Sequence, residues 1–236
     1  MSIFICFGVK LKKEEASTVT KFKRIPKHIG VIPDGNRRWA VDNGMGKSEG
    51  YDYGIKPGFD LFEECKRLGI GELTLYGFTQ DNTKRPAEQK QAFKKACVDA
   101  VMELEKREAN LLVVGDSQSH NFPEELLKYT ERRIKNQNGI NVNFLVNYDW
   151  KWDVVGLLEN PKTKEHEIQK NIKSKGVSRI DLVIRWGDRR RLSGFLPIQT
   201  VYSDFYILPK MWPDFEMGDL HEALAWYDKQ DVTLGG

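Results

Sequence analysis

Six short apolar runs recur along the chain and limit the folds that it can adopt. They are rich in β-branched or aromatic residues and do not alternate with polar ones, and they cover residues 29–33, 73–78, 111–115, 142–146, 180–184 and 205–208. Such runs are typical of strands buried on both faces of a parallel sheet. Helical patterns lie between them, at 59–68, 87–108 and 124–135. The sequence therefore predicts an α/β fold with a central, mostly parallel six-stranded sheet flanked by helices.

The domain organisation follows from length and composition. With 236 residues, of which 40% are hydrophobic, the chain is long enough to bury one substantial core. We expect an N-terminal arm over 1–24 and a single domain over 25–236. The polar, lysine-rich segment 160–176 is interpreted as a surface helix with loops. A net charge of +3 is too mild to indicate a nucleic-acid partner, although it suits an anionic small molecule.

The cysteines and the N-terminal segment indicate the cellular compartment of the protein. Cys6, Cys65 and Cys97 form no CxxC pair, so we expect reduced, buried thiols and no zinc site. The apolar segment 3–9 is too short to cross a bilayer and lacks the features of a secretory signal. These features predict a cytoplasmic protein. Peripheral contact with a membrane surface through the arm is an open alternative.

The first apolar run leads into the stretch richest in reactive groups. An acid, a glycine, an amide, two guanidiniums and an indole follow it in six consecutive positions. Asp34 can hold a divalent cation, and Gly35 lets the backbone approach a ligand closely. Asn36 can donate or accept a hydrogen bond, while Arg37 and Arg38 can pair with phosphate oxygens. This predicts a site for a polyphosphate and a metal. The alternative is a turn with a solvated pair of arginines.

Polar clusters also follow the second and fifth runs, at the end of a parallel sheet where ligands bind. Residues 79–86 combine an acid, amides and Arg85 before a helix that Pro86 would begin, and the alternative role is helix capping. Four arginines fall within 185–191, where a buried strand ends, which favours a second diphosphate site. Asp204 begins the sixth strand. It is either a second carboxylate for the metal or a solvated residue.

The helical pattern over 87–108 carries a row of small residues. Ala92, Ala96 and Ala100 recur every four positions, which leaves a shallow apolar groove along one face. Two interpretations stay open: close packing against a neighbouring helix, or the wall of a hydrocarbon tunnel. The chain contains no GxxxxGK[ST] or GxGxxG loop, which disfavours nucleotide-binding folds. It also lacks the DDxxD pair with which all-helical trans-type prenyl synthases hold magnesium.

With these residues assembled, the chain resembles the cis-prenyltransferases, the family of undecaprenyl diphosphate synthase, from about residue 28 to residue 227. The resemblance rests on short motifs in the family's order and spacing, at 28–40, 75–79, Asn82, 85–86, 114–116, 147–148, 152–153, 181–185, 191–193, 195–196 and 212–215. Each motif by itself is weak evidence for this family. In this order and spacing, the motifs together are highly specific for it.

The resemblance implies a homodimeric α/β fold with a hydrophobic tunnel. It also implies a reaction in which Mg²⁺ helps an allylic prenyl diphosphate to ionise. The cation is then attacked by the five-carbon isopentenyl diphosphate, and loss of a proton gives a cis double bond. By position, Asp34, Asn36 and Asn82 are the expected catalytic residues. Asp34 is the metal-linked acid and Asn82 assists proton removal. Asp204 stands where the family has a magnesium-binding Glu.

The resemblance also assigns the substrate-binding positions. Gly35, Asn36, Arg37, Arg38 and Arg85 would hold the allylic diphosphate. The acceptor diphosphate would be held by Arg185, Arg191 and Ser193. Further substrate-binding positions are Trp39, Lys47, Tyr51, Thr79 and Asp81.

The chain departs from the family pattern mainly in the acceptor half. Near the allylic site, Tyr51 replaces a His and Lys47 an Arg. Elsewhere Thr83 replaces a Trp, Asp81 a Glu and Gly194 an Asn, and the sequence Trp-Gly-Asp-Arg at 186–189 replaces x-Gly-Gly-Glu. Two alternatives to cis elongation therefore stay open. One is a non-head-to-tail, lavandulyl-type condensation with dimethylallyl diphosphate as the acceptor. The other is a catalytically silent, isoprenoid-binding partner subunit.

Overall fold

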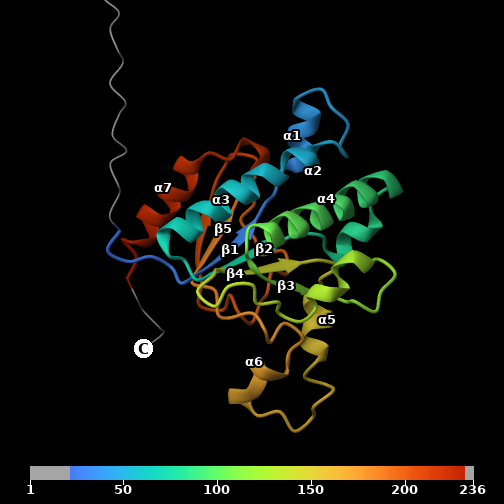
Figure 1. Cartoon of the computed structure of the whole chain (residues 1–236), viewed down its shortest axis with the longest axis vertical. Helices are drawn as coiled ribbons and strands as arrows, with labels where there is room; N and C mark the ends of the chain where they lie inside the picture. The colour runs from blue at the N-terminus through green and yellow to red at the C-terminus, as the bar shows by residue number, and fades with distance from the viewer. Residues whose placement is uncertain (1–21, 232–236) are drawn as a thin grey trace, which may run out of the picture.

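A six-stranded, all-parallel sheet forms the centre of the protein in the computed structural model, which describes residues 22–231 (Figure 1). The strand order is β3-β4-β2-β1-β5-β6. Every strand overlaps one of the predicted apolar runs, which confirms the predicted sheet. The strands are β1 (His28–Ile32), β2 (Glu72–Tyr76), β3 (Asn110–Val114), β4 (Asn141–Leu145), β5 (Leu182–Arg185) and β6 (Asp204–Ile207).

The strand β1 lies at the middle of the sheet, between β2 and β5. Its residue Gly30 is in register with Thr74 on one side and Val183 on the other. All five residues of β1 are buried, which explains why this strand reads as an uninterrupted apolar run. Because the strands are parallel, the residues after β1, β2 and β5 emerge at the same edge of the sheet.

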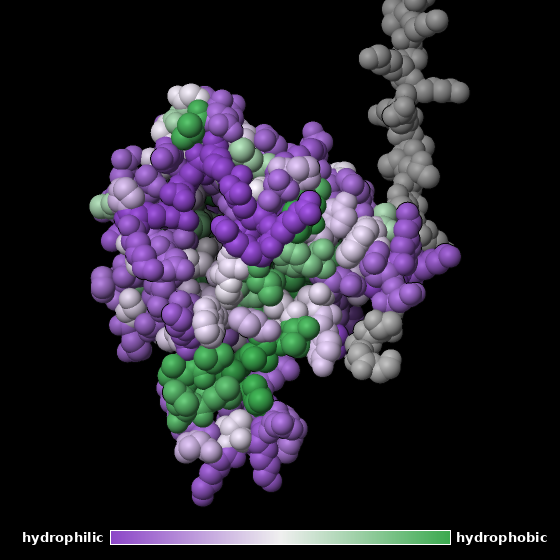
Figure 2. Space-filling model, turned by 180° about the vertical axis from the view of Figure 1, so that it is seen from behind, coloured by the Kyte–Doolittle hydropathy of each residue, from purple (hydrophilic) through white to green (hydrophobic). Residues whose placement is uncertain are grey.

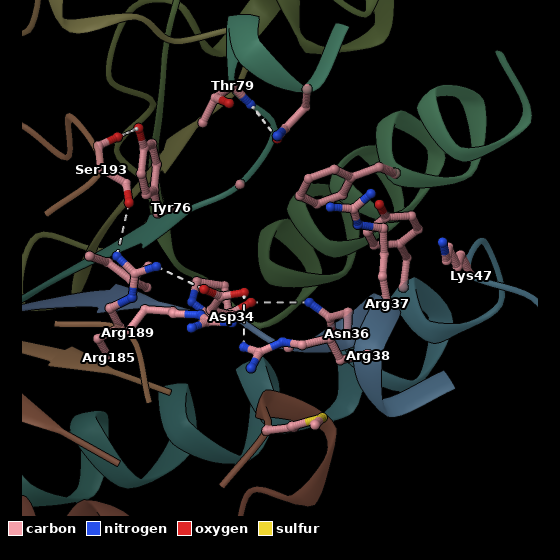
Figure 3. A pocket seen from close by; sticks show the side chains of 18 of the residues that line it. Asp34, Asn36, Arg37, Arg38, Lys47, Tyr76, Thr79, Arg185, Arg189 and Ser193 are labelled. Carbon is pink, nitrogen blue, oxygen red and sulfur yellow. Dashed lines mark hydrogen bonds and ion pairs between the residues drawn. The ribbon is translucent and has the colours of Figure 1, made fainter. Parts of the chain in front are cut away.

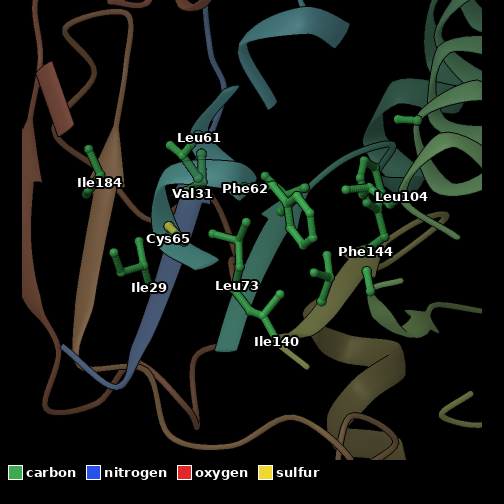
Figure 4. Close-up of a cluster of buried hydrophobic side chains, with 14 of the residues drawn as sticks. Ile29, Val31, Leu61, Phe62, Cys65, Leu73, Leu104, Ile140, Phe144 and Ile184 are labelled. Atoms are coloured by element: carbon green, nitrogen blue, oxygen red, sulfur yellow. The ribbon is translucent and has the colours of Figure 1, made fainter. Parts of the chain in front are cut away.

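Three long helices cover one face of the sheet (Figure 1): α3 (Ile55–Leu68), α4 (Ala87–Lys106) and α7 (Met217–Tyr227). The main core lies between these helices and the strands. Figure 4 shows Leu61 and Phe62 of α3 above Val31 and Leu73 of the sheet, and all four side chains are fully buried. Truncating one of these leucines to alanine would cost about 2 to 5 kcal/mol of folding free energy.

The opposite face is covered mostly by irregular segments together with α5 (Trp150–Val155) and α6 (Ile168–Asn171). A second core cluster lies there and includes Val183, Phe195 and Leu196. The remaining elements are α1 (Asn36–Asp42), α2 (Gly50–Tyr53), and the 3₁₀ helices η1 (Gln80–Lys84), η2 (Glu124–Tyr129), η3 (Glu165–Glu167) and η4 (Trp212–Asp214).

The helix predicted over 124–135 is wrong beyond its first half. Only η2 forms, and the chain then runs extended, so that Arg133 and Leu111 exchange backbone hydrogen bonds of 2.8 and 3.1 Å. The Arg132 guanidinium donates to the Asn143 side chain at 2.6 Å and to the Gly176 carbonyl at 2.8 Å. These tertiary bonds outweigh the local helical preference. The segment 160–176 does contain short helical turns, η3 and α6, between loops.

No helix within residues 22–231 is long and apolar enough to cross a bilayer. The segment 3–9 and nearly all of the predicted arm 1–24 lie outside the described residues. Peripheral membrane contact, the cytoplasmic location and the division at residue 24 therefore stay predictions.

Candidate functional site

A polar cavity of about 760 Å³ opens at the C-terminal edge of the sheet, where β1, β2 and β5 end (Figure 3). This is the edge at which parallel sheets bind ligands. Asp34 lies near the middle of the close-up view. Arg185, Arg189 and Ser193 lie on one side of it, and Arg37 and Lys47 on the other. The cavity thus has two halves with Asp34 between them.

The turn from β1 into α1 places Asp34 in the cavity. The Asp34 amide donates to the Ile32 carbonyl at 3.0 Å, which reverses the chain directly after the strand. Gly35 follows with φ of +110°, a conformation that glycine adopts without strain. A Cβ at this position would lie only 2.8 Å from Cβ of Met211. The glycine is therefore required by both its backbone angle and its close neighbour.

The Asp34 carboxylate is held by two guanidiniums. Nη2 of Arg185 donates to its Oδ2 at 2.7 Å, and Nη2 of Arg38 lies 3.6 Å from its Oδ1. The Arg38 guanidinium also donates to the Gly187 carbonyl at 2.8 Å. One third of the Asp34 side-chain surface remains exposed to the cavity, at 33%. The carboxylate is thus fixed in position while one side stays open to a ligand.

Arg185 links Asp34 to the loop that follows β5. Its Nη1 donates to Ser193 Oγ at 3.0 Å and to the Arg191 carbonyl. Ser193 has φ of +54°, an uncommon angle for a residue with a side chain. The Tyr76 hydroxyl donates to the Ser193 carbonyl at 2.8 Å and holds the loop from the other side. Such tertiary bonds can maintain a strained backbone at a ligand site.

The cluster after β2 serves as a cap and also lines the cavity. Oδ1 of Asn82 accepts the Thr79 amide at 2.9 Å, at the beginning of η1. The capping interpretation of this cluster is therefore realised. Thr79, Asp81 and Asn82 nevertheless all border the cavity. This cluster therefore both caps η1 and lines the cavity.

Tyr51 and Arg85 form the wall near α4. Nη1 of Arg85 donates to the Tyr51 hydroxyl at 2.8 Å, and the Tyr51 ring stacks on Phe93 with 4.5 Å between centroids. Burial raises the pKa of the Tyr51 phenol, an effect that the charges of Arg85 and Arg37 oppose. The hydroxyl therefore stays protonated at neutral pH. It can donate to an anion while it accepts from Arg85.

Positive charge dominates the cavity. Seven cationic side chains border it against three carboxylates, those of Asp34, Asp42 and Asp81. An excess of guanidiniums at the end of a sheet suits an anionic ligand rich in phosphate oxygens. The cationic residues are Arg37, Arg38, Lys47, Arg85, Arg185, Arg189 and Arg191.

Nearly all of the predicted site residues meet in this cavity. Fourteen of them border it, namely Asp34, Gly35, Asn36, Arg37, Arg38, Lys47, Tyr51, Thr79, Asp81, Asn82, Arg85, Arg185, Arg191 and Ser193. Trp39 is not among the lining residues, and its indole N–H donates to Asp214 at 2.6 Å. Asp204 also lies outside, at the first residue of β6, 3.3 Å from the Arg24 guanidinium. In a parallel sheet that position is at the opposite end of the strand from the cavity.

Several lining residues were not identified from the sequence. Arg189 falls inside the predicted arginine cluster, but the sequence did not distinguish it from its neighbours. Tyr76 and Phe93 look like ordinary core residues. Met211 approaches the cavity from the segment after β6, for which the sequence carries no signal.

The side chains at the site could hold a metal ion only together with a bound diphosphate. Within 22–231 there is no cluster of three or more His, Cys, Asp or Glu side chains that could hold a metal ion. Asp34 is the one carboxylate between the two halves of the cavity. Mg²⁺ is often bound through one or two carboxylates together with phosphate oxygens and water. Asp34 with a bound diphosphate would satisfy that preference.

A small apolar pocket of about 70 Å³ adjoins the polar cavity. The two share Pro33, Asn36, Tyr51, Tyr76, Gly77 and Phe93 as lining residues. From there the pocket extends between α3 and α4, bordered by Phe59, Ala96, Cys97, Ala100, Leu104, Phe144 and Trp212. The predicted groove of small residues is therefore part of a pocket, although Ala92 is not one of its lining residues. The arrangement suits a ligand with a charged head and a short apolar tail.

The chain is similar to several known proteins. The family model described as "Putative undecaprenyl diphosphate synthase" matches residues 32–235. An isoprenyl transferase of Clostridium perfringens is 31% identical, and the alignment covers 98% of both chains. One from Streptococcus thermophilus is 32% identical over 90% of this chain and 94% of that protein.

Two further relatives carry more specific names. A ditrans,polycis-undecaprenyl-diphosphate synthase of Yersinia pseudotuberculosis, named as (2E,6E)-farnesyl-diphosphate specific, is 29% identical over 90% of this chain and 91% of that protein. Among solved structures, lavandulyl diphosphate synthase from Lavandula x intermedia, in complex with dimethylallyl diphosphate, superposes with a TM-score of 0.78 at 24% identity. It covers 89% of this chain and 98% of its own. At that identity the likeness concerns the fold.

Proposed function

This chain belongs to the undecaprenyl diphosphate synthase family of prenyltransferases, and from that membership we propose that it condenses an allylic prenyl diphosphate with isopentenyl diphosphate. The product would be a cis-polyprenyl diphosphate, and the cofactor Mg²⁺. One observation carries the proposal. A cationic cavity with two halves around Asp34 continues into an apolar pocket. The charged groups suit two diphosphates and the pocket suits a prenyl tail.

The reaction breaks an allylic C–O bond and a C–H bond, forms one C–C bond and shifts the double bond of the acceptor. The allylic C–O bond breaks, and its electron pair leaves with the diphosphate. The double bond of isopentenyl diphosphate then supplies the electrons of the new C–C bond. A proton leaves the neighbouring carbon, so that the products are a longer prenyl diphosphate, inorganic pyrophosphate and a proton. The barrier is dominated by charge that develops on the leaving diphosphate.

The donor half stabilises that leaving group. Arg37 and Arg85, together with Arg38 beside Asp34, would bind its oxygens. Asp34 would hold Mg²⁺, which when bound neutralises part of the diphosphate charge. Because the Arg185 bond fixes the carboxylate in advance, little reorganisation is needed at the moment of ionisation.

Asn82 serves proton removal only indirectly. Its Oδ1 accepts the Thr79 amide, and its Nδ2 makes no hydrogen bond within residues 22–231. An amide is a poor base, so the proton must end on another group, such as a diphosphate oxygen. We assign Asn82 the positioning of that acceptor through its free Nδ2 group.

The size of the apolar pocket favours a second candidate reaction. A cavity of about 150 Å³ holds one benzene molecule, and the pocket here has about half that volume. As it stands, the pocket is therefore too small for a long prenyl chain. A ten-carbon product of lavandulyl type, made from two molecules of dimethylallyl diphosphate, would require less enlargement of this space than a longer chain would.

Product analysis distinguishes these reactions. The protein is incubated with Mg²⁺ and an allylic diphosphate of five, ten, fifteen or twenty carbons, together with either isopentenyl or dimethylallyl diphosphate. The products are dephosphorylated and identified. We expect cis-elongated products that require isopentenyl diphosphate. Product formed only from dimethylallyl diphosphate would favour the lavandulyl-type reaction, and binding without any turnover would indicate a silent partner subunit.

We also propose that the protein is a homodimer. Three large apolar side chains are exposed in or just after α5, namely Trp150, Val155 and Leu158, with exposed fractions of 42% to 77%. We call them the α5 surface. Figure 2 shows a hydrophobic region on the face of the molecule opposite to that of Figure 1. Monomers rarely expose such a region, and a two-fold axis would let two copies cover it mutually.

A further inference from the structure

The arginine that the sequence places first in the acceptor site has little freedom to bind a ligand. The Arg185 side chain is only 3% exposed. Both N–H groups of its Nη1 are directed to Ser193 Oγ and the Arg191 carbonyl, and its Nη2 donates to Asp34. Its role is therefore mainly to position Asp34 and the loop. Its Nε makes no hydrogen bond within residues 22–231, and a second, exposed cation in this half would add to the attraction for an acceptor diphosphate.

Arg189 is free to supply one. Its side chain is exposed and borders the polar cavity, and it makes no side-chain hydrogen bond or ion pair with any residue in 22–231. Figure 3 shows it beside Arg185, on the Ser193 side of Asp34. Arg190 is equally exposed but is not among the described residues that border the cavity. Neighbouring arginines thus differ in their access to the site.

The backbone directs Arg189 toward the cavity. The Gly187 amide donates to the Lys210 carbonyl at 2.7 Å, and the Asp188 amide donates to the Leu208 carbonyl at 3.0 Å. Gly187 has φ of +84° and Asp188 of +55°. A Cβ at Gly187 would lie 2.5 Å from the Arg38 guanidinium. The chain is therefore anchored and turned directly beside Asp34 before it reaches Arg189.

We propose that Arg189 binds the diphosphate of the acceptor substrate and sets the affinity of the acceptor half for it. This inference rests on the proposed function. It concerns a residue at which the chain carries Arg where the related pattern has Glu, a change of two charge units. Arg191 borders the same half and would bind the same group. Arg189 would thereby add a contact to those of Arg185 and Arg191.

The test compares adjacent arginines. Arg189→Ala, Arg189→Lys and the matched control Arg190→Ala are titrated calorimetrically with isopentenyl diphosphate, without and with Mg²⁺. We expect Arg189→Ala to weaken binding about tenfold, as for the loss of one charge-assisted contact. Arg189→Lys should retain part of the affinity because it keeps the charge. Arg190→Ala should bind as the unchanged protein does.

Steady-state kinetics show whether Arg189 acts on the acceptor or on the allylic substrate. At saturating allylic diphosphate, Arg189→Ala should raise KM for the five-carbon acceptor about tenfold and leave kcat and the allylic KM nearly unchanged. Equal effects of Arg189→Ala and Arg190→Ala would overturn the inference, as would a loss confined to the allylic KM. If the unchanged protein forms no prenyl product, the proposed function fails. The binding titration still decides whether Arg189 recognises a diphosphate.

Discussion

The Arg185 guanidinium donates to the Asp34 carboxylate at 2.7 Å and joins the end of β1 to the end of β5. Asp34 begins the turn that would hold the allylic diphosphate, and Arg185 begins the loop that would hold the acceptor. The pair is therefore the mechanical link between the two halves of the site. Its removal should disturb ionisation and acceptor placement together.

We expect Arg185→Gln to lower kcat about 100-fold, since Asp34 loses its fixed position and the loop loses two hydrogen bonds. The double variant Asp34→Asn/Arg185→Gln should be no less active than Asp34→Asn, because the two residues act as a unit. Steady-state kinetics on the three variants, with circular dichroism to verify the fold, check this. Independent, additive losses would contradict the coupling.

The size of the apolar pocket should control product length. Phe93 stacks on Tyr51 at the boundary between the polar cavity and the apolar pocket. Phe93→Ala removes most of an aromatic ring there and should shift the products toward longer chains. Chromatography of dephosphorylated products checks this. The control is Val98→Ala, on the same helix but outside the pocket lining. Unchanged chain length in Phe93→Ala would contradict the assignment of the pocket.

Glu64 should make folding stability depend on pH. The Arg67 guanidinium and His221 lower the pKa of the Glu64 carboxyl from 4.5 to about 2. A lowered pKa means that the folded state binds the proton less tightly, so the stabilisation is present above pH 4.5 and is lost as the pH falls toward 2. Since Arg67 is half exposed, we expect Glu64→Gln to cost about 1 to 2 kcal/mol of unfolding free energy at pH 7.

Urea denaturation at pH 7 and pH 3 measures this effect. The difference between Glu64→Gln and the unchanged protein should shrink at pH 3. The matched control is Glu63→Gln, which removes an exposed partner of Arg107. A difference that stays constant between the two pH values would show that Glu64 acts by packing alone.

The α5 surface should decide the oligomeric state. Leu158 is 77% exposed, so Leu158→Glu should leave the folded protomer intact while placing a charge in the proposed interface. Sedimentation should show a dimer for the unchanged chain and a monomer for this variant. Tyr53→Glu, on the opposite side of the sheet, should remain dimeric. A monomeric unchanged protein at micromolar concentration would refute the proposed dimer.

The fold could be predicted because its strands are buried on both faces. Burial on both sides makes each strand an apolar run, and β1 is the clearest case. The segment after Tyr129 could not be predicted in the same way. Its conformation depends on Arg132 and Arg133, whose partners Asn143 and Leu111 belong to the sheet. Such long-range bonds leave no local pattern.

The site was predictable to a similar degree. Asp34 and Arg38 lie in an unusual run of consecutive polar residues, so metal and phosphate binding can be inferred from the sequence alone. Which arginines after Arg185 in this cluster face the cavity depends on the turn at Gly187 and on its backbone bonds to the segment after β6. The position of Asp204 at the start of its strand, beside Arg24, likewise follows from register rather than from residue type.

The release of pyrophosphate by Asp34→Asn tests the role of Asp34 in the ionisation step. With Mg²⁺, an allylic diphosphate and isopentenyl diphosphate, the unchanged protein should release one pyrophosphate for each new C–C bond. Asp34→Asn should fold normally and bind the allylic diphosphate, yet release pyrophosphate at least about 1,000-fold more slowly, since it lacks the charge that holds the metal. Release at the rate of the unchanged protein would contradict the role of Asp34 in ionising the allylic diphosphate.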